Sequence, residues 1–410
     1  MKILFYPYHL GYLHTNQQIS PVAGLPMSVP YTMEDMEKDL WGVTHNVGNT
    51  IHVEAPSRML EYDTFNSAST YLIDLYRTYG SDPVATAKVI SDRFDYLLIS
   101  EANVFRLHGK DKSESETETQ RLKIIADIVD NLTIPFSVIG AGLQSIPSDN
   151  LDDFDSNIAY FLRVVDKKSV MLGVRGRATR DWLKRAGISR NVKALGCPSM
   201  FLYPKNILGI QYKEINRNSQ ILTAGYLTPR HIKHRRKRVN ISVDIARNFI
   251  TDFVMQDDYY ELSEGQIENH FNEALGILDR DFVLKTLSDL GLDASAIRNF
   301  FHFRNSYAWR IKSGQYDAYI GDRLHGGIAA MQAMRPAMIF HDDYRVEELA
   351  GLFEFPSASI QSIQKHGVME LITQNYTPHA FDRFKETYSN ILNNFRTEMK
   401  NAGLKLREPV

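Results

Sequence analysis

The stretch AYIGDRLHGGIAAMQAMRPAMIFHDDYR, residues 318–345, carries the pattern that decides the fold. A short apolar run ends just before Arg323, apolar residues with helical spacing follow, and a second short apolar run comes after Pro336. A strand, a helix and a second strand in this order form the repeating unit of a parallel sheet. We therefore predict that residues 318–345 form a strand–helix–strand unit.

The same alternation recurs along the whole chain. Helical patterns between the apolar runs include residues 120–132, residues 177–186 with Gly187 as a stop signal, and residues 346–353. Such alternation predicts parallel sheets with helices on both faces and ligands outside the carboxyl ends of the strands. The apolar runs are MKILFY, DYLLIS, FSVIGAG and SVMLGVR in the first half, and ILTAGY, DFVMQ, DAYIGDR and AMIFHD in the second.

The alternation occurs twice, and the segment between the two sets loses its periodicity and gathers Pro, Gly and Asn. We predict an α/β fold of two Rossmann-like domains facing each other across a cleft, residues 1–205 and 220–377, joined by a linker at 206–219. Residues 378–410 have the pattern of an amphipathic helix, which we expect to pack back on the first domain. Its apolar residues are Phe381, Phe384, Tyr388, Ile391, Leu392, Phe395 and Met399.

The composition excludes several classes of protein. A chain of 410 residues is long enough for two domains. Lys and Arg number 47 against 49 Asp and Glu, a net charge of -2, so no global charge favours nucleic acid or a membrane. The single cysteine, Cys197, excludes an internal disulfide, and no apolar stretch approaches the roughly 18 residues of a spanning helix. We expect a soluble cytoplasmic protein.

Residues 322–327 have the features of an anion-binding site at the start of a helix. Asp322 is placed to cap the helix, whose free backbone N–H groups and dipole favour a phosphate or a carboxylate. Arg323 could grip the same anion through two parallel hydrogen bonds, and His325 adds a proton donor. Gly326 and Gly327 have no side chains, so a ligand could approach the backbone closely.

Two further arginines lie where strands should end. Arg175 closes SVMLGVR immediately before a predicted helix, and Arg345 lies just before VEEL. The carboxylates Glu101, Asp342 and Asp343 are interpreted as solvated or capping groups rather than catalytic ones. Together with Arg323 these arginines indicate an anionic ligand, although any one of them alone is more often part of a surface ion pair. In the same way, His325 could act only as a helix cap.

Polar loops also follow the predicted strands of the first half. The segment NVGNTIH, residues 46–52, could open the first major helix with a glycine turn, and SEANVF occupies residues 100–105. The segment VIGAGLQS supplies Gly140 and Gly142, without the three-glycine spacing and downstream acidic residue of a dinucleotide site. A nicotinamide cofactor is therefore not supported.

The histidines and the cysteine show no metal-binding pattern. His45, His52 and His341 lack a recognisable ligand spacing, and the lone Cys197 is interpreted as a small packing residue. We predict no structural zinc site and no cofactor.

Two segments depart from the alternation. Residues 110–118, KDKSESETE, are polar and charged without apolar partners, which is typical of a mobile surface loop or lid. Residues 230–238, RHIKHRRKR, form a dense basic run. Such a run is usually a solvated helix face, and the alternative is contact with acidic lipid or with a pyrophosphate group.

The sequence also resembles the polysaccharide pyruvyl transferase family. The stretch GDRLHGGIAAMQAMRPAMIFHDDYRVEEL resembles its C-terminal signature, in which an R-x-H triplet opens a helix, and VMLGVRGRATRDWLKRAGISRNVKALGCPSMFL resembles its central block. This resemblance implies a GT-B-like pair of Rossmann-type domains, with phosphoenolpyruvate as the donor and a sugar or lipid-linked oligosaccharide of a cell-surface or exopolysaccharide glycan as the acceptor. The implied reaction forms a pyruvate ketal and releases phosphate.

The resemblance also implies which residues take part. The second domain would hold the donor and the first domain the acceptor. The implied catalytic residues are His325, Arg323 and Arg175. The donor site would consist of Arg323, Arg175, Gly326, Gly327 and Arg345, and the acceptor site of Asn46, Gly48, Asn49, Glu101, Asn103 and Gly142.

Two alternative functions remain open from the sequence. A GT-B-type glycosyltransferase would use the same two-domain architecture and arginines to hold the diphosphate of a nucleotide sugar. A non-catalytic glycan-binding homologue is the other alternative, because the family commonly has Asn-x-Gly-Asp where this chain has Asn46-Val47-Gly48-Asn49. We expect no nucleic-acid partner, and a peripheral contact with the inner membrane face if the acceptor is carried on a lipid.

Overall fold

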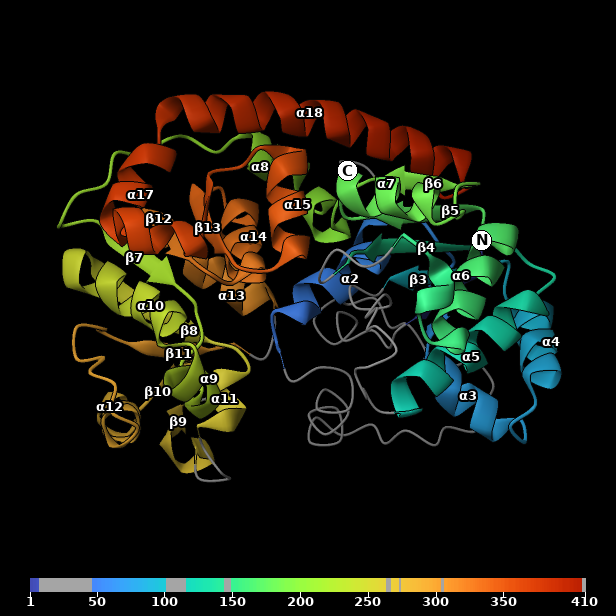
Figure 1. The fold of residues 1–410 in the computed structure, drawn as a ribbon, viewed down its shortest axis with the longest axis horizontal. Helices are drawn as coiled ribbons and strands as arrows, with labels where there is room; N and C mark the ends of the chain where they lie inside the picture. Colours follow the sequence, from blue (N-terminus) through green and yellow to red (C-terminus); the bar gives the residue numbers. More distant parts are fainter. Residues whose placement is uncertain are drawn as a thin grey trace.

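The computed structural model contains two α/β halves that lie side by side (Figure 1). Glu101, Asn103 and residues 110–115, which the sequence analysis singled out, lie outside the part of the chain that the structure describes. The described residues are 1–6, 46–100, 116–143, 149–262, 267–272, 274–303 and 306–407.

The first half is built on a six-stranded sheet whose paired strands are all parallel. In the order β2-β1-β3-β4-β5-β6, its strands are Ala68–Ser69, Ile3–Tyr6, Tyr96–Ser100, Phe136–Ala141, Met171–Val174 and Val192–Ala194. The strands β1, β3, β4 and β5 are buried throughout, as expected when helices cover both faces of a parallel sheet. The helices are α2 (Asn49–Met59), α3 (Leu72–Thr78), α4 (Pro83–Arg93), α5 (Glu116–Asp130), α6 (Ser156–Lys168) and α7 (Arg177–Arg185).

The second half is built on an eight-stranded sheet in the order β14-β13-β12-β7-β8-β11-β10-β9. The first six strands in this order are parallel, and β10 and β9 add an antiparallel edge. In chain order the strands β7 to β14 are Gln220–Thr223, Ile250–Met255, Phe271–Asn272, Ile277–Leu278, Phe300–His302, Ala318–Gly321, Ala337–His341 and Ser357–Ser359. Because β7 lies between β8 and β12, the order of the strands reverses there, and ligand sites of parallel sheets form at such a point.

Short and medium-length helices cover this second sheet (Figure 1). The central helix is α14 (Leu324–Gln332), which connects β12 to β13 and is buried along its whole length. The others in chain order are α8 (Pro204–Leu208), α9 (Pro229–His234), α10 (Arg236–Asn248), α11 (Asp258–Glu261), α12 (Arg280–Asp289), α13 (Ser306–Ser313), α15 (Tyr344–Phe353), α16 (Ile363–His366) and α17 (Val368–Asn375).

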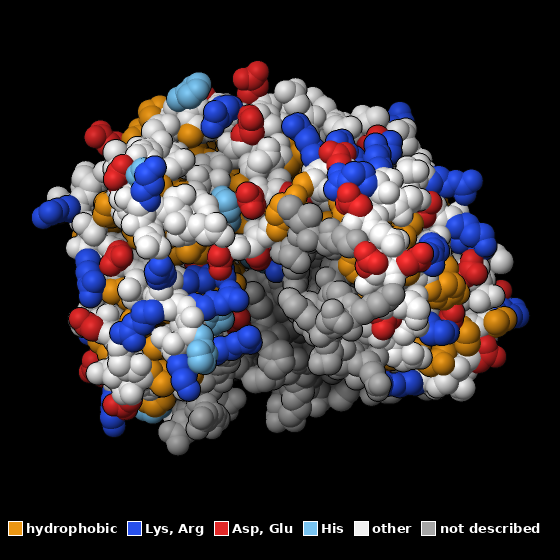
Figure 2. Space-filling view, in the orientation of Figure 1, with side chains coloured by type: hydrophobic (Ala, Val, Ile, Leu, Met, Phe, Trp, Pro, Cys, Tyr) orange, Lys and Arg blue, Asp and Glu red, His pale blue; other side chains and the backbone are white. Residues whose placement is uncertain are grey.

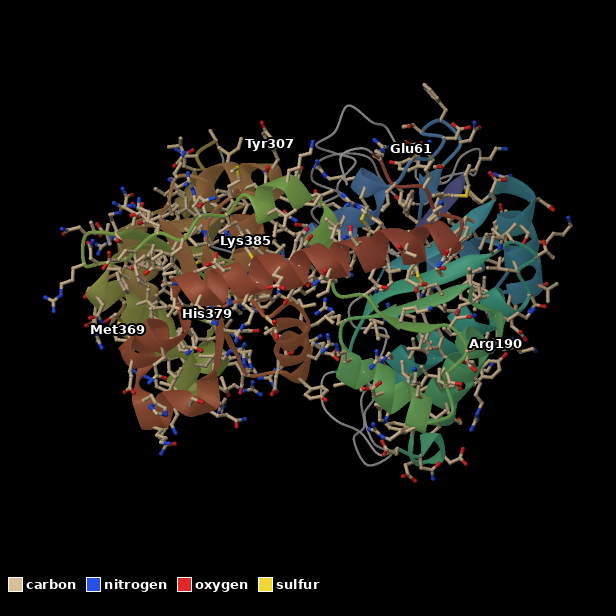
Figure 3. All side chains as sticks on the ribbon, turned by 90° about the horizontal axis from the view of Figure 1, so that it is seen from above. Glu61, Arg190, Tyr307, Met369, His379 and Lys385 are labelled. Carbon is tan, nitrogen blue, oxygen red and sulfur yellow. The ribbon has the colours of Figure 1, made fainter. Side chains whose placement is uncertain are left out.

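The long C-terminal helix α18 (Pro378–Asn401) crosses from the second half to the first, as predicted (Figure 3). All seven apolar residues predicted for its inner face are buried. The ring of Phe395 stacks on Phe201 at 3.9 Å, and Lys193 on β6 pairs with Glu398 at 3.0 Å. None of the described helices, α18 included, is long and apolar enough to cross a membrane.

The eight apolar runs all form strands, and the main corrections concern where elements begin. Helix α5 begins at Glu116, so residues 116–118, which were predicted to belong to a surface loop, are part of a helix. Helix α15 begins at Tyr344 rather than Val346, because Asp343 caps it by accepting a hydrogen bond from the backbone N–H of Val346. The short strands β2, β6, β9, β10, β11 and β14 were not predicted.

Candidate functional site

The predicted site residues of the two halves approach one another at the carboxyl ends of β5, β12 and β13. Arg175 follows β5, His325 opens α14 after β12, and Arg345 lies in the first turn of α15 after β13. Arg175 and Arg345 both lie close enough to His325 for their charges to lower its pKa. The structure therefore brings Arg175 of the first half close to His325 and Arg345 of the second half.

His325 is a neutral, buried histidine in a positively charged environment. Its side chain is buried, and no described residue hydrogen bonds to Nε2. Burial lowers the pKa of His325 to about 3, and the charges of Arg175, Arg345 and Arg323 act in the same direction. In the unliganded protein the imidazole is therefore uncharged near neutral pH, and it can accept a proton if a bound anion offsets the arginine charges.

The lowered pKa of His325 predicts that the protein loses stability as the pH falls below about 6.5. The unfolded chain binds a proton on this histidine below about pH 6.5, whereas the folded protein does so only near the lowered pKa. Between these values the unfolded state binds more protons, so the free energy of unfolding decreases with decreasing pH. Urea unfolding at a series of pH values should show a shallower decrease for His325→Asn, and equal slopes would contradict the assignment.

Arg175 is buried, and one nitrogen of its guanidinium group makes no hydrogen bond to the described residues. Its Nε donates to the carbonyl oxygen of Gly140 at 3.0 Å, and its Nη2 is buried with no hydrogen-bond partner among the described residues. Gly140 is left-handed, with φ of +79°, at a register shift in β4 that presents this carbonyl. A side chain at Gly142 would lie 3.0 Å from Cδ of Arg175, so Gly142 makes room for the arginine. Contact of Gly142 with an acceptor stays a prediction.

Arg323 is held by groups of its own half. Its Nε donates to the carbonyl oxygen of Gly225 at 2.8 Å, its Nη2 binds Asp257, and the guanidinium lies 3.2 Å from the ring centroid of Tyr226. These contacts fix the loop that opens α14. Contact between Arg323 and a donor stays a prediction.

Asp322 does not cap α14 as expected. Arg323 occupies the N-cap position, and no side chain caps the helix there. Asp322 instead accepts a hydrogen bond from Nε of Arg238 at 2.6 Å, in a buried ion pair. The pairing explains the difference, because a buried carboxylate needs a charged partner.

Gly326 and Gly327 let α14 lie close to the sheet. A Cβ at Gly326 would be 2.7 Å from the hydroxyl of Tyr319 on β12, and one at Gly327 would be 2.7 Å from Cδ1 of Ile339 on β13. Sheet residues therefore fill the space that a side chain would need at either glycine. A contact between a donor and their backbone N–H groups stays a prediction.

We expect Gly326→Ala to destabilise the protein by about 1–3 kcal/mol, the usual cost of overpacking a well-packed core. The new methyl group would displace the Tyr319 hydroxyl, which donates to the carbonyl oxygen of Arg323 at 2.8 Å. Thermal unfolding measures the change. Gly351→Ala on α15 is the matched control, since nothing lies within 4 Å of a Cβ there, and equal melting temperatures for the two variants would contradict the prediction.

Arg345 and the loop before α2 also reach the region between the halves. Nη2 of Arg345 pairs with Asp343 at 3.1 Å. Helix α2 begins at Asn49, as NVGNTIH predicted, and Asn46 accepts a hydrogen bond from the N–H of Gly48 at 2.9 Å. A Cβ at Gly48 would overlap Oε1 of Gln256, which follows β8 of the second half. The acceptor role of Asn46, Gly48 and Asn49 stays a prediction, as does that of Glu101 and Asn103.

A buried carboxylate that the sequence analysis missed joins the two halves beside Arg175. Glu348 on α15 accepts hydrogen bonds from the backbone N–H of Thr179 at 3.0 Å and from its hydroxyl at 2.7 Å. Burial raises the pKa of Glu348, which those hydrogen bonds and Arg175 counteract. Glu348 lies in the second turn of α15, and a glutamate there is too common on helices to be recognised as a signal.

A second missed group is a buried polar cluster around His52 on α2. Its Nδ1 lies 3.2 Å from Sγ of Cys197, and its Nε2 lies 3.4 Å from the hydroxyl of Ser100. Cys197 is also 2.9 Å from the hydroxyl of Ser199, and the rings of His52 and His325 are 6.2 Å apart. The interpretation of Cys197 as a packing residue is therefore incomplete. No sequence signal could pair His52 with Cys197, because 145 residues separate them.

The comparisons with known proteins agree with the predicted family. The family model for polysaccharide pyruvyl transferase matches residues 69–343, which include β3 to β13 and the residues around His325. The chain belongs to this family. No curated protein matches the chain.

Several solved structures are similar over nearly the whole chain. HepE of Anabaena in complex with UDP is 12% identical, with 98% of this chain and 100% of that chain covered and a TM-score of 0.43. The UDP-GlcNAc 2-epimerase of Neisseria meningitidis bound to UDP-GlcNAc is 14% identical, with 98% and 99% covered and a TM-score of 0.46. The glycosyltransferase SnogD of Streptomyces nogalater is 12% identical, with 98% and 99% covered and a TM-score of 0.35.

Proposed function

We propose that this pyruvyl transferase moves the pyruvyl group of phosphoenolpyruvate onto a sugar of a cell-surface or exopolysaccharide glycan, as a ketal, with release of phosphate. The observation that carries the proposal is the neutral His325, buried among arginine charges between the two halves. The arginine charges would attract an anionic donor, and the imidazole of His325 could transfer the proton that the donor must gain on carbon. Membership of the family supports the transfer of a pyruvyl group to a polysaccharide.

The arginines suit the two anionic groups of the donor. Phosphoenolpyruvate carries a carboxylate and a phosphate, and guanidinium groups match both through parallel hydrogen bonds. Arg175 has a buried Nη2 without a partner among the described residues, which makes it the first candidate for such a contact. Arg345, Arg323 and the backbone N–H groups at the start of α14 complete the proposed donor site.

The proposed reaction transfers protons between the donor, the two sugar hydroxyls and the enzyme. The enol methylene of the donor gains a proton, and a sugar hydroxyl attacks the adjacent carbon and loses its own proton. Phosphate then leaves, and a second sugar hydroxyl closes the ketal ring and loses its proton. His325 would deliver the first proton, since the negative charge of the bound donor offsets the arginines and raises the pKa of the imidazole. Phosphoenolpyruvate serves as a co-substrate, and the proposal includes no cofactor.

The test is incubation with phosphoenolpyruvate and a panel of glycans and glycosides. We expect release of inorganic phosphate together with the mass gain of a pyruvate ketal on an acceptor. A glycosyltransferase, the first alternative, would instead release a nucleotide from a nucleotide sugar and leave phosphoenolpyruvate intact. A non-catalytic homologue would bind glycans without turnover of either donor, and either result would overturn the proposal.

We also propose that the basic run at residues 230–238 brings the enzyme to an anionic membrane surface that carries a lipid-linked acceptor. The run forms α9 and the start of α10, and Figure 2 shows Lys, Arg and His side chains gathered over this part of the second half. Not all of the run is a solvated face, because Arg238 is buried against Asp322. Arg230, Lys233 and Lys237 are exposed on the surface, and the amine of Lys237 donates to the side chain of Gln364 at 2.8 Å.

We expect a triple substitution of Arg230, Lys233 and Lys237 by Gln to weaken binding to anionic vesicles by up to about 3 kcal/mol, at about 1 kcal/mol for each basic residue. The binding should also decrease as the salt concentration rises. Vesicle sedimentation measures the effect, while turnover on a small soluble glycoside should not change. The matched control replaces three exposed lysines elsewhere by Gln, Lys205, Lys285 and Lys400, and equal losses in the two variants would contradict a specific membrane-binding surface.

A further inference from the structure

Three buried side chains with metal-ligand chemistry converge between the two halves. His52 comes from α2, Cys197 from the turn after β6, and His325 from the start of α14. Each of them offers one ligand atom, and these atoms all lie within 4.8 Å of one another. The three side chains are 1%, 0% and 7% exposed, and Nε2 of His325 has no hydrogen-bond partner among the described residues.

The distances are close to those of a tetrahedral zinc site. Bonds of about 2.3 Å to sulfur and about 2.0–2.1 Å to nitrogen place the ligand atoms roughly 3.3–3.6 Å apart. The distance from Nδ1 of His52 to Sγ of Cys197 is 3.2 Å, and no pair of ligand atoms exceeds 4.8 Å. A contraction of roughly 1 Å at the widest pair would bring the three ligands into this geometry. We propose that His52, Cys197 and His325 bind Zn²⁺, with a fourth coordination position left open.

The surroundings of the three residues fit this role. The ring nitrogen of His52 that faces away from Cys197 lies 3.4 Å from the hydroxyl of Ser100, and such outer partners orient ligating histidines. Two nitrogens and one thiolate form a donor set that suits zinc better than Mg²⁺ or Ca²⁺. The thiolate offsets one of the two metal charges. Arg175, Arg345 and Arg323 are the nearby cations, and the carboxylates of Asp343 and Glu348 interact favourably with Arg175.

The zinc would act as an inhibitor of the proposed transferase rather than as a cofactor. His325 is the residue proposed to deliver a proton, and coordination of its ring nitrogen to a metal removes it from proton transfer. The ion would also hold α2 of the first half to α14 of the second. This site goes beyond the proposed function, because zinc binding to these residues does not depend on which donor or acceptor the enzyme uses.

The test is a metal titration of the full-length protein, with any affinity tag removed. We expect one Zn²⁺ per chain in competition with a chromophoric chelator, and a sulfur-to-metal charge-transfer absorption when Co²⁺ replaces Zn²⁺. Cys197→Ser should abolish that absorption and weaken Zn²⁺ binding by more than the roughly 10- to 100-fold that loss of an outer partner costs. His52→Ala should weaken binding to a similar extent while leaving a cobalt–thiolate absorption.

The matched control is His366→Ala, which removes a histidine that pairs with Glu370 on α17 at 3.1 Å, outside the cluster. It should bind Zn²⁺ as the unaltered protein does. Circular dichroism of each variant separates lost binding from lost folding, and if Cys197→Ser does not fold, His52→Ala and His325→Asn carry the test. Binding that is equally tight in the cluster variants, or no stoichiometric binding to the unaltered protein, would overturn the proposal. Because both readouts are of binding, these results hold whether or not the transferase activity is found.

Discussion

Replacing His325 with Asn is expected to lower kcat by about 10²- to 10⁴-fold, the usual contribution of a positioned proton donor, with little change in the affinity for phosphoenolpyruvate. Asn keeps a polar side chain of similar shape at the start of α14, but it cannot take up and deliver a proton. The surrounding arginines, which would hold the anionic donor, are unchanged in this variant. The loss should therefore appear in the chemical step rather than in donor binding.

Equilibrium binding of phosphoenolpyruvate and steady-state kinetics together separate these effects. If the affinity for the donor falls while kcat stays the same, His325 binds the donor and does not transfer a proton. His366→Asn is the matched control, because His366 is a partly exposed histidine on α16 that pairs with Glu370 at 3.1 Å. Its kinetic constants should match those of the unaltered enzyme.

The sequence predicts the parallel strands well because local patterns determine them. A central strand of a parallel sheet is a short, continuous apolar run, and all eight runs form strands. The strands that the sequence analysis missed are at most three residues long, such as β2 and β6, and lie near the edges of their sheets. So short a segment has no measurable periodicity, since its conformation depends on the neighbouring strand with which it pairs.

Of the candidate site, only the residues that directly follow predicted strands could be recognised from the sequence. Arg175 and Arg345 were recognised because the carboxyl ends of parallel strands collect ligand-binding residues, and both lie near His325. Contacts across 145 residues, such as that of His52 with Cys197, leave no mark in a single sequence. The ion pair of Asp322 with Arg238 was missed for the same reason. The residues next to Asp322 in the sequence indicate only that it could cap the following helix.

Arg175→Lys is expected to lower kcat by about 10²- to 10³-fold, the range seen when one preorganised donor to a developing negative charge is removed. The substitution keeps the positive charge but not the planar fork of the guanidinium. Arg175 uses Nε to bind the carbonyl oxygen of Gly140, and Nη2 is left for a ligand. A lysine amine that stays on Gly140 cannot also reach the donor in the same geometry.

A comparison of Arg175→Lys with Arg175→Met distinguishes geometry from charge. If Arg175 acted only through its charge on His325, the lysine variant would retain nearly normal turnover and the methionine variant would not. If the guanidinium of Arg175 binds the donor directly, both variants lose turnover. The lysine variant then keeps the pH dependence of kcat, because the positive charge beside His325 remains. Arg190→Lys is the matched control, since Arg190 lies exposed on the first half, where Nη1 donates to the carbonyl oxygen of Lys167 at 3.2 Å (Figure 3). Near-normal turnover of Arg175→Lys would remove Arg175 from direct contact with the donor and leave it a purely electrostatic role.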